Sequence, residues 1–225
     1  MIRSAWAVFQ KDLLLELRSK VAVNTVLLFG VVSLVVVSFS VGAEELTPTV
    51  QASLLWVVLL FSAITSLSLL FVREEDSGTA LVLRVVAPAQ AVFMGKFWLN
   101  LLLFFIQFLV LVPLYHIFLK PSVSSIPLYL LILFLGLGCI TIACTFAAAL
   151  VARAASRGAL FGVMSLPIMI VPLWSLAGGS TKLFNRELPA AELFSSLAPY
   201  LQVLTAYLVV MVTLSFLLFP HLWDD

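Results

Sequence analysis

Charged residues are scarce in this sequence. Asp, Glu, Lys and Arg together make up 10% of its 225 residues, whereas 63% are hydrophobic and the mean hydropathy is +1.20. Soluble domains carry about 25% charged residues, so this composition excludes a water-soluble fold and predicts an integral membrane protein. The net charge of +1 gives no sign of nucleic-acid binding, and we expect none.

The long apolar runs also lack the groups on which intramembrane chemistry depends. No Asp, Glu, Lys, Arg or His falls where we expect the middle of a span, whereas ion- and proton-coupled transporters need such groups to bind an ion or relay protons. This argues against secondary transport, although a backbone-lined sodium site on a broken helix stays open. A membrane hydrolase is disfavoured for the same reason, and we expect no catalytic residue.

Two motifs of hydrolytic enzymes are missing. There is no HExxH sequence, the signature of many metalloproteases. There is no GxxxxGK[ST] loop either, because Gly95-Lys96 is followed by Phe97 and no glycine stands at the required distance upstream. Such a loop is what cradles nucleotide phosphates. We therefore expect that the chain is not an enzyme and that any ATP hydrolysis takes place in a separate subunit.

Cysteine and histidine are rare as well. Cys139 and Cys144 lie five residues apart in one apolar run, a spacing that turns them to different helix faces. We interpret them as small core side chains rather than a disulfide or a metal pair. His116 and His221 fall near the ends of apolar runs. Each could reach a metal porphyrin, but a polar anchor is the simpler interpretation, and we expect no metal site.

Long apolar runs dominate the rest of the chain. About 20 helical residues cross a hydrocarbon core of about 30 Å, and six runs reach that length. We predict an all-α polytopic membrane protein with spans at Val21–Gly42, Val50–Val72, Phe97–Leu119, Ile126–Val151, Gly158–Gly178 and Tyr200–Phe219.

The positive charges predict the orientation of these spans. With the N-terminus inside, nine Lys and Arg residues fall on the cytoplasmic side and three on the other: Lys120, Lys182 and Arg186. Cytoplasmic loops carry the excess of Lys and Arg, so both termini are expected in the cytoplasm. The nine inner residues are Arg3, Lys11, Arg18, Lys20, Arg73, Arg84, Lys96, Arg153 and Arg157.

The first 20 residues have the pattern of an amphipathic helix rather than a signal peptide, because they mix both charges and have no unbroken apolar core. Apolar residues recur every three to four positions. We expect a helix in the plane of the membrane interface, with an ordinary lead-in to the first span as the alternative. The apolar stripe comprises Ile2, Trp6, Phe9, Leu13 and Leu17, and Gln10, Lys11, Asp12 and Arg18 lie largely off it.

The segment from Arg73 to Lys96 is the polar exception between two apolar runs. Asp76 or Ser77 could cap a helix that begins near Gly78, and Pro88 limits its far end. About ten helical residues are too few to be stable alone in water. We therefore predict that this helix docks on the membrane domain, on a partner or on both; a simple spacer loop is the alternative. Its apolar side comprises Leu81, Val82, Val85 and Val86.

The last outer loop, Gly179 to Pro199, is the longest. Prolines near its end and glycines near its start predict breaks, and we expect a separate small helix over Ala190 to Ala198. Pro167 and Pro172 lie in the fifth span, where they should bend or loosen the helix. Their role is either a hinge or static packing.

Several short motifs are spread along nearly the whole chain. They are Lys11-Asp12-Leu13 with Glu16 and Arg18, Arg73-Glu74, Gly78-Thr79 with Leu83, Pro88, Gly95-Lys96, Leu135-Gly136, Arg157, Leu166-Pro167 and Pro172. Together with the predicted spans and helices, these motifs resemble the permease subunits of type-2 ABC exporters and, more narrowly, the CcmB family of cytochrome c maturation. The chain departs from the family pattern at Leu81, where the family usually has an acidic residue.

The resemblance implies one permease domain over residues 1–225, in the inner membrane, with two copies in the complex. It implies a CcmA-like ATPase subunit that binds the ATP, a CcmC-like haem-handling membrane protein and a periplasmic haem chaperone. Haem is expected in the complex rather than bound directly here. The implied coupling helix, which would sit in a groove of the ATPase, spans residues 74–87 and includes Glu74, Glu75, Asp76, Gly78, Leu81, Arg84 and Val85. The implied interfacial helix includes Trp6, Phe9, Lys11, Asp12, Leu13, Glu16 and Arg18.

Two other functions stay open. The chain could be a membrane scaffold that assembles haem-handling partners without transport, or an ABC-type exporter of another small or lipidic substrate. The ATPase activity of the complex would separate the scaffold from the other two, because a scaffold need not stimulate hydrolysis.

Overall fold

The computed structural model describes residues 1–19, 21–40, 46–67, 74, 78–152, 157–185 and 190–224. Within these residues every regular element is a helix, which confirms the predicted all-α class. The helices are α1 (Ile2–Ser19), α2 (Val21–Ser40), α3 (Pro48–Leu67), α5 (Thr79–Val86), α6 (Ala89–Leu119), α7 (Ile126–Val151), α8 (Arg157–Phe184) and α9 (Ala190–Asp224).

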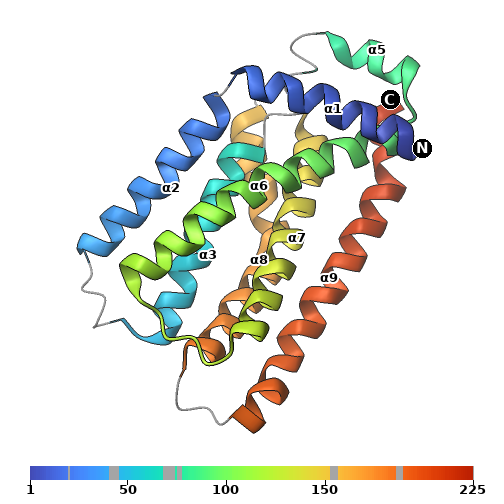
Figure 1. Cartoon of the computed structure of the whole chain (residues 1–225). Helices are drawn as coiled ribbons and strands as arrows, with labels where there is room; N and C mark the ends of the chain where they lie inside the picture. The colour runs from blue at the N-terminus through green and yellow to red at the C-terminus, as the bar shows by residue number, and fades with distance from the viewer. Residues whose placement is uncertain are drawn as a thin grey trace.

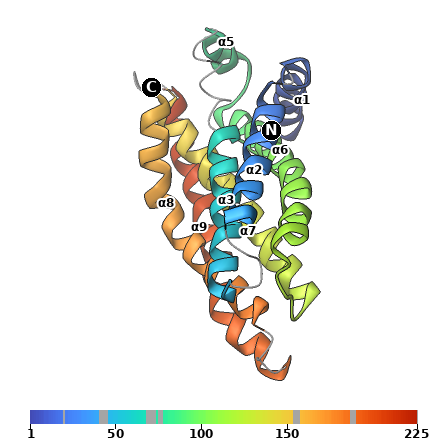
Figure 2. The same cartoon turned by 90° about the vertical axis from the view of Figure 1, so that its left-hand side faces the viewer.

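Long helices form a bundle that α1 crosses at one end (Figure 1). The short helix α5 lies beyond α1 at that same end, and both chain termini are found there. Figure 2 shows the same arrangement from the side. We call this end the α1 end and the opposite one the far end.

The long helices have the length and composition of membrane spans. Five described helices qualify: α3, α6, α7, and α8 and α9 over Val163–Phe184 and Glu192–Trp223. Helix α2 adds 20 residues, of which Gly30–Phe39 is an apolar stretch. The expected six spans are consistent with this arrangement.

Helix α7 lies at the centre of the bundle, since 72% of its apolar window is buried. A small residue makes its closest approach possible. A Cβ atom at Gly136 would overlap the indole ring of Trp56 on α3. The same indole donates its Nε1–H to Ser180 Oγ on α8 at 2.9 Å. Trp56 therefore joins three helices through one glycine contact and one hydrogen bond.

Buried polar pairs tie α6 to its neighbours. Asn100 Nδ2 donates to Thr145 Oγ1 on α7 at 2.9 Å, and Ser62 Oγ on α3 donates to Gln107 Oε1 at 3.0 Å. Hydrogen bonds between helices hold membrane bundles together because hydrocarbon offers no other partner. Helix α6 is thus bonded to both α3 and α7 in the interior.

Two predicted boundaries are wrong at the far end. Helix α8 continues past Gly178 and Gly179 to Phe184, and α9 is continuous from Ala190 through Pro199. The separate helix expected over 190–198 is therefore the beginning of α9. A proline removes one backbone hydrogen bond, and spanning helices tolerate this loss. At Gly178, a Cβ would lie 2.5 Å from the Tyr200 ring, so these glycines serve packing between helices instead of ending one.

Candidate functional site

Helix α5 is short and begins at a glycine in the left-handed region. It spans Thr79–Val86, and its N-cap, Gly78, has φ 69° without a side-chain cap. The expected start near Gly78 is confirmed, while the proposed capping residues Asp76 and Ser77 lie outside the described residues. At the other end the Ala87 N–H donates to Leu83 O at 3.0 Å, and Pro88 follows in extended conformation.

One side of α5 presents valines to the surroundings. The exposed fractions are 63% for Val82, 87% for Val85 and 75% for Val86. Figure 1 shows that this helix projects from the α1 end, apart from the long helices. Eight residues cannot hold a helix by themselves in water, so α5 depends on contacts with other elements, and its valine side remains an exposed apolar face.

The last turn of α5 is fixed by an aromatic contact. The Arg84 guanidinium lies 5.3 Å from the centre of the Trp223 ring near the end of α9. Trp223 stacks on Phe219 with centroids 5.5 Å apart, and Phe219 contacts Phe93 on α6 at 5.1 Å. Cation–π contacts of this kind contribute about 0.5–2 kcal/mol. Arg84 thus faces its own chain, on the side away from Val85.

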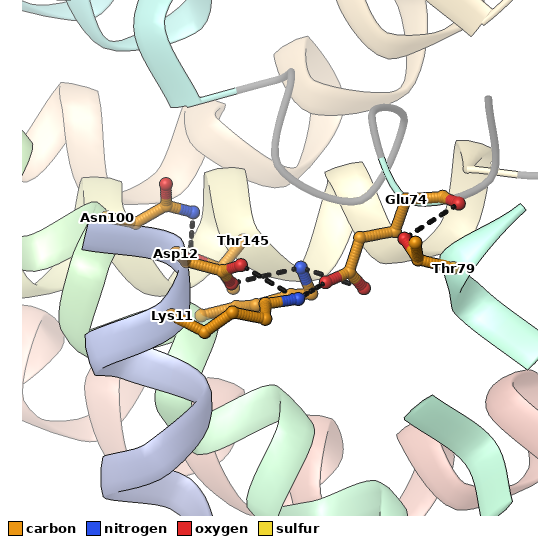
Figure 3. A network of polar contacts seen from close by, with 7 residues as sticks. Lys11, Asp12, Glu74, Thr79, Asn100 and Thr145 are labelled. Carbon is orange, nitrogen blue, oxygen red and sulfur yellow. Dashed lines mark hydrogen bonds and ion pairs between the residues drawn. The ribbon is translucent and has the colours of Figure 1, made fainter. Parts of the chain in front are cut away.

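Four charged residues from distant parts of the sequence meet at the α1 end (Figure 3). We call Lys11, Asp12, Glu74 and Lys96 the charge cluster. Lys96 Nζ lies 3.3 Å from Asp12 Oδ2 and 3.1 Å from Glu74 Oε2. Lys11 Nζ lies 3.1 Å from Asp12 Oδ1 and also donates to Glu74 Oε1. Each lysine therefore bridges both carboxylates, and the four formal charges cancel.

The charge cluster is largely shielded from water. Lys96 is 0% exposed, and Asp12 and Glu74 are each 5% exposed. Only Lys11 keeps substantial access to solvent. Burial lowers the pKa of Lys11, but the hydrogen bond to Glu74 and the charges of Asp12 and Glu74 outweigh it and leave that pKa above its ordinary value. Removing one member of a buried ion pair typically costs about 3–5 kcal/mol because its partner is left uncompensated.

Close packing of α1 on α6 creates this cluster. A Cβ atom at Gly95 would lie 2.7 Å from Ala5 O and 2.8 Å from Val8 Cβ, so only glycine fits there without displacement. The next residue, Lys96, is thereby placed beside Asp12, one turn along α1 from Val8. The Gly95-Lys96 dipeptide thus serves helix packing and ion pairing.

Helix α1 packs on the bundle through a side other than its apolar stripe. Asp12 and Glu16 are buried together with Ala5 and Val8, whereas most of the predicted apolar stripe is exposed or half-buried. Asp12, which the sequence placed off the apolar stripe, can be buried because Lys11 and Lys96 supply the positive charges that its carboxylate needs. The stripe residues are exposed at Ile2, Trp6 and Leu17 and half-buried at Phe9 and Leu13; Arg18 is exposed.

Sequence reasoning selected Lys11, Asp12 and Glu74 as site residues, but it did not predict that they lie in contact. It also missed Lys96 as a site residue. A lysine at the start of a long apolar helix was the available signal, because such a group needs an acidic partner. Glu75 and Asp76 lie outside the described residues, and so does the side chain of Leu81.

An apolar groove opens beside α1, between α6 and α7. Its volume is about 440 Å³. Trp6 stacks on Phe9 at 5.0 Å and meets Trp98 edge-on at 6.5 Å. The groove offers apolar contact surface near the α1 end. Its lining consists of Trp6, Phe9, Trp98, Leu101, Leu102, Phe105, Phe134 and Leu137.

The histidines and cysteines lie apart from one another. The part of the chain that the structure describes contains no group of three His, Cys, Asp or Glu side chains suited to a metal. His116 Nδ1 lies 2.8 Å from Val112 O, and its ring contacts Tyr115 and Tyr129 edge-on. Both cysteines are buried as free thiols. Among the described residues the densest polar chemistry is therefore the charge cluster.

No curated protein matches the chain closely enough to count as a relative. One family model, described as CcmB protein, matches residues 3–222. The match includes α1, the charge cluster, α5 and all the long helices. The chain therefore belongs to the CcmB family, the haem-exporter permeases of the cytochrome c maturation system.

Proposed function

We propose that this chain couples ATP hydrolysis in a separate CcmA-like subunit to haem handling, or to release of the haem-loaded periplasmic chaperone. Membership of the family supports a permease component of the haem export system. The observation that carries the coupling role is α5, whose valines are exposed at Val82, Val85 and Val86. An exposed apolar helix face suits a groove on a partner protein.

In this proposal the α1 end faces the cytoplasm. Nine of the twelve Lys and Arg residues fall on that side of the predicted topology, in agreement with the excess of positive charge inside. Both termini and α5 share this end. A cytoplasmic ATPase could then reach α5 directly, and the protein would be a multi-pass subunit of the inner membrane.

The valine side of α5 would fill the ATPase groove. Glu74 and Arg84 contact their own chain through the charge cluster and Trp223, so they hold α5 in place and the valines make the contact. Glu75 and Asp76 precede the helix and would add charge-assisted contacts. Two copies of this chain would serve the two ATPase subunits, alongside a CcmC-like protein and the chaperone.

The test replaces an exposed valine. Val85→Glu should abolish co-purification of the ATPase subunit from detergent-solubilised membranes while membrane insertion stays normal. A buried charge without a partner typically costs several kcal/mol at an interface. Val50→Glu is the matched control, because Val50 is 43% exposed at the far end of the bundle, and it should retain the ATPase.

Two results would argue against this proposal, one from the co-purification experiment and one from the ATP hydrolysis rate of the wild-type complex. Full recovery of the ATPase with Val85→Glu would count against α5 as the docking element. Recovery of a wild-type complex in which this chain leaves the hydrolysis rate unchanged would favour a scaffold.

A further inference from the structure

We infer that the charge cluster is the mechanical link between α5 and the membrane bundle, with Glu74 as the positioning residue that passes movement of α5 to α1 and α6. This inference rests on the proposed function, because it assumes that a partner moves α5. Beyond the proposed function, the inference names the contacts through which movement of α5 would be passed to the membrane-spanning helices.

The first step is that α1 and α6 form one unit. Gly95 brings α6 so close to α1 that a Cβ would lie 2.7 Å from Ala5 O. Asp12 and Lys96 add an ion pair at 3.3 Å across the same contact. Trp6 meets Trp98 edge-on at 6.5 Å one turn away. Backbone packing, charge and aromatic contact therefore hold residues 5–12 of α1 against residues 95–98 of α6.

The second step is that Glu74 attaches α5 to this unit. Its carboxylate contacts Lys11 on α1 and Lys96 on α6, the latter at 3.1 Å. Its carbonyl oxygen accepts from Thr79 Oγ1, in the first turn of α5, at 3.5 Å. Glu74 thus contacts α5 through its backbone and both other helices through its side chain; Figure 3 labels Glu74 with Lys11 and Thr79.

The third step is that α6 carries the displacement into the interior. Asn100 lies one helical turn beyond Lys96 and donates to Thr145 on α7 at 2.9 Å. Two turns further, Gln107 accepts from Ser62 on α3 at 3.0 Å. Packed helices and hydrogen-bonded side chains can carry coupling between distant sites. A displacement of Glu74 would therefore be passed to α6 and, through these two hydrogen bonds, to α7 and α3.

The opposite end of α5 is attached to a different helix. The Arg84 guanidinium lies 5.3 Å from the centre of the Trp223 ring on α9. Within the residues that the structure describes, the ion pairs that join α5 to α1 and α6 lie on its Glu74 side. The Glu74 side is therefore the point through which a load would enter these two helices.

The experiment replaces the ionic link with a covalent one that can be closed at will. In a Lys11→Cys, Glu74→Cys double variant the Asp12–Lys96 pair stays intact, so the remaining buried charges still cancel. A short bifunctional thiol reagent then joins the two new cysteines, while Cys139 and Cys144 are buried. Two quantities are measured in the reconstituted complex. One is the amount of ATPase subunit that stays bound, and the other is the ATP-dependent release of the haem-loaded chaperone.

We expect the open double variant to retain the ATPase, because α5 keeps its valine face, and to lose ATP-dependent release. Closing the cross-link should restore release. A structural defect alone would not be repaired in this way. Wild-type protein treated with the reagent and a Glu192→Gln variant, altered on the exposed far end of α9, are the controls and should release normally.

Normal release by the open variant, or failure of the closed cross-link to restore release, would overturn the inference. Neither result would affect the docking role of α5, which the Val85→Glu experiment tests separately. If wild-type complex itself shows no ATP-dependent release, the proposed function fails and the inference with it.

Discussion

Lys96 shows how one residue can depend on partners far away in the sequence. It lies in the second turn of α6, is fully buried and contacts carboxylates from residues 12 and 74. Loss of either acid would leave part of this buried positive charge uncompensated. Its neighbour Gly95 fixes the distance at which α1 can supply one of them.

Lys96→Ala should lower the free energy of unfolding by about 3–5 kcal/mol, since the buried carboxylates of Asp12 and Glu74 would both lose a cation that contacts them. Thermal unfolding in detergent measures the change. Lys182→Ala, which alters a half-buried lysine towards the far end, should shift the midpoint little. Equal shifts of the unfolding midpoint for the two variants would mean that the charge cluster stabilises the protein no more than a half-buried lysine elsewhere does.

Gly95→Ala should displace α1 from α6, because the new methyl group would lie 2.7 Å from Ala5 O, closer than van der Waals contact allows. We expect about 1–3 kcal/mol of destabilisation from this overpacking. Faster proteolysis within residues 1–19 would report it. Gly138→Ala is the control, since its Cβ would lie 3.3 Å from the end of the Leu208 side chain, which can move aside.

For single residues, the sequence predicts the helix on which each lies but not the distant residues that it contacts. Periodicity identifies α1 as amphipathic and places Asp12 off the apolar stripe, but it does not show that Asp12 is buried, because apolar periodicity takes no account of distant charges. Of the two lysines that contact Asp12, Lys11 is its neighbour, whereas Lys96 lies 84 residues away in sequence. No local pattern indicates such a pairing. An unmatched lysine in an apolar helix is the signal that points to it.

Helix α5 is the element whose attachment decides the proposed role. Gly78 and Pro88 place its two ends in the sequence, and both boundaries agree with the structure within a residue or two. What could not be foreseen is which side faces the bundle. That depends on Trp223 and Lys96, which belong to other elements.

Arg84→Ala should loosen α5 without removing its valine face. The lost cation–π contact contributes about 0.5–2 kcal/mol, which corresponds to amide exchange about 2- to 30-fold faster over residues 79–86. Hydrogen exchange with mass spectrometry measures this rate. Arg3→Ala, an exposed change on α1, should leave exchange in α5 unaltered, and unchanged exchange with Arg84→Ala would argue against the Trp223 anchor.

Helices α8 and α9 show where element boundaries mislead. Glycine and proline near residues 178 and 199 suggested a long outer loop, but both helices continue through them. A membrane environment penalises unpaired backbone groups, so a helix continues where a soluble chain would break. The same residues serve packing, as the Gly178–Tyr200 contact shows.

On the scale of the whole molecule, composition was sufficient for the fold class. Long apolar runs and sparse charge predict a helical membrane bundle, and the structure agrees. The motifs spread along the chain also pointed to the family that the match over residues 3–222 shows. The three-dimensional meeting of residues 11, 12, 74 and 96 required the bundle itself.

The proposed topology can be tested by labelling from one side of the membrane. Val85→Cys should react with a membrane-impermeant maleimide only from the cytoplasm, and Ser195→Cys, exposed near the far end of α9, only from the opposite side. The native cysteines are buried and should stay unlabelled. Labelling of Val85→Cys from the outside would invert the orientation and exclude a cytoplasmic ATPase as its partner.

The exposed valine side of α5 should also affect how quickly the protein is degraded in the cell. Exposed apolar side chains invite chaperones and proteases to bind, and Val85 is 87% exposed. A chain made in excess of its partner would display this face unprotected and be degraded. Its abundance should therefore follow the supply of the partner, so that the two subunits accumulate in fixed proportion.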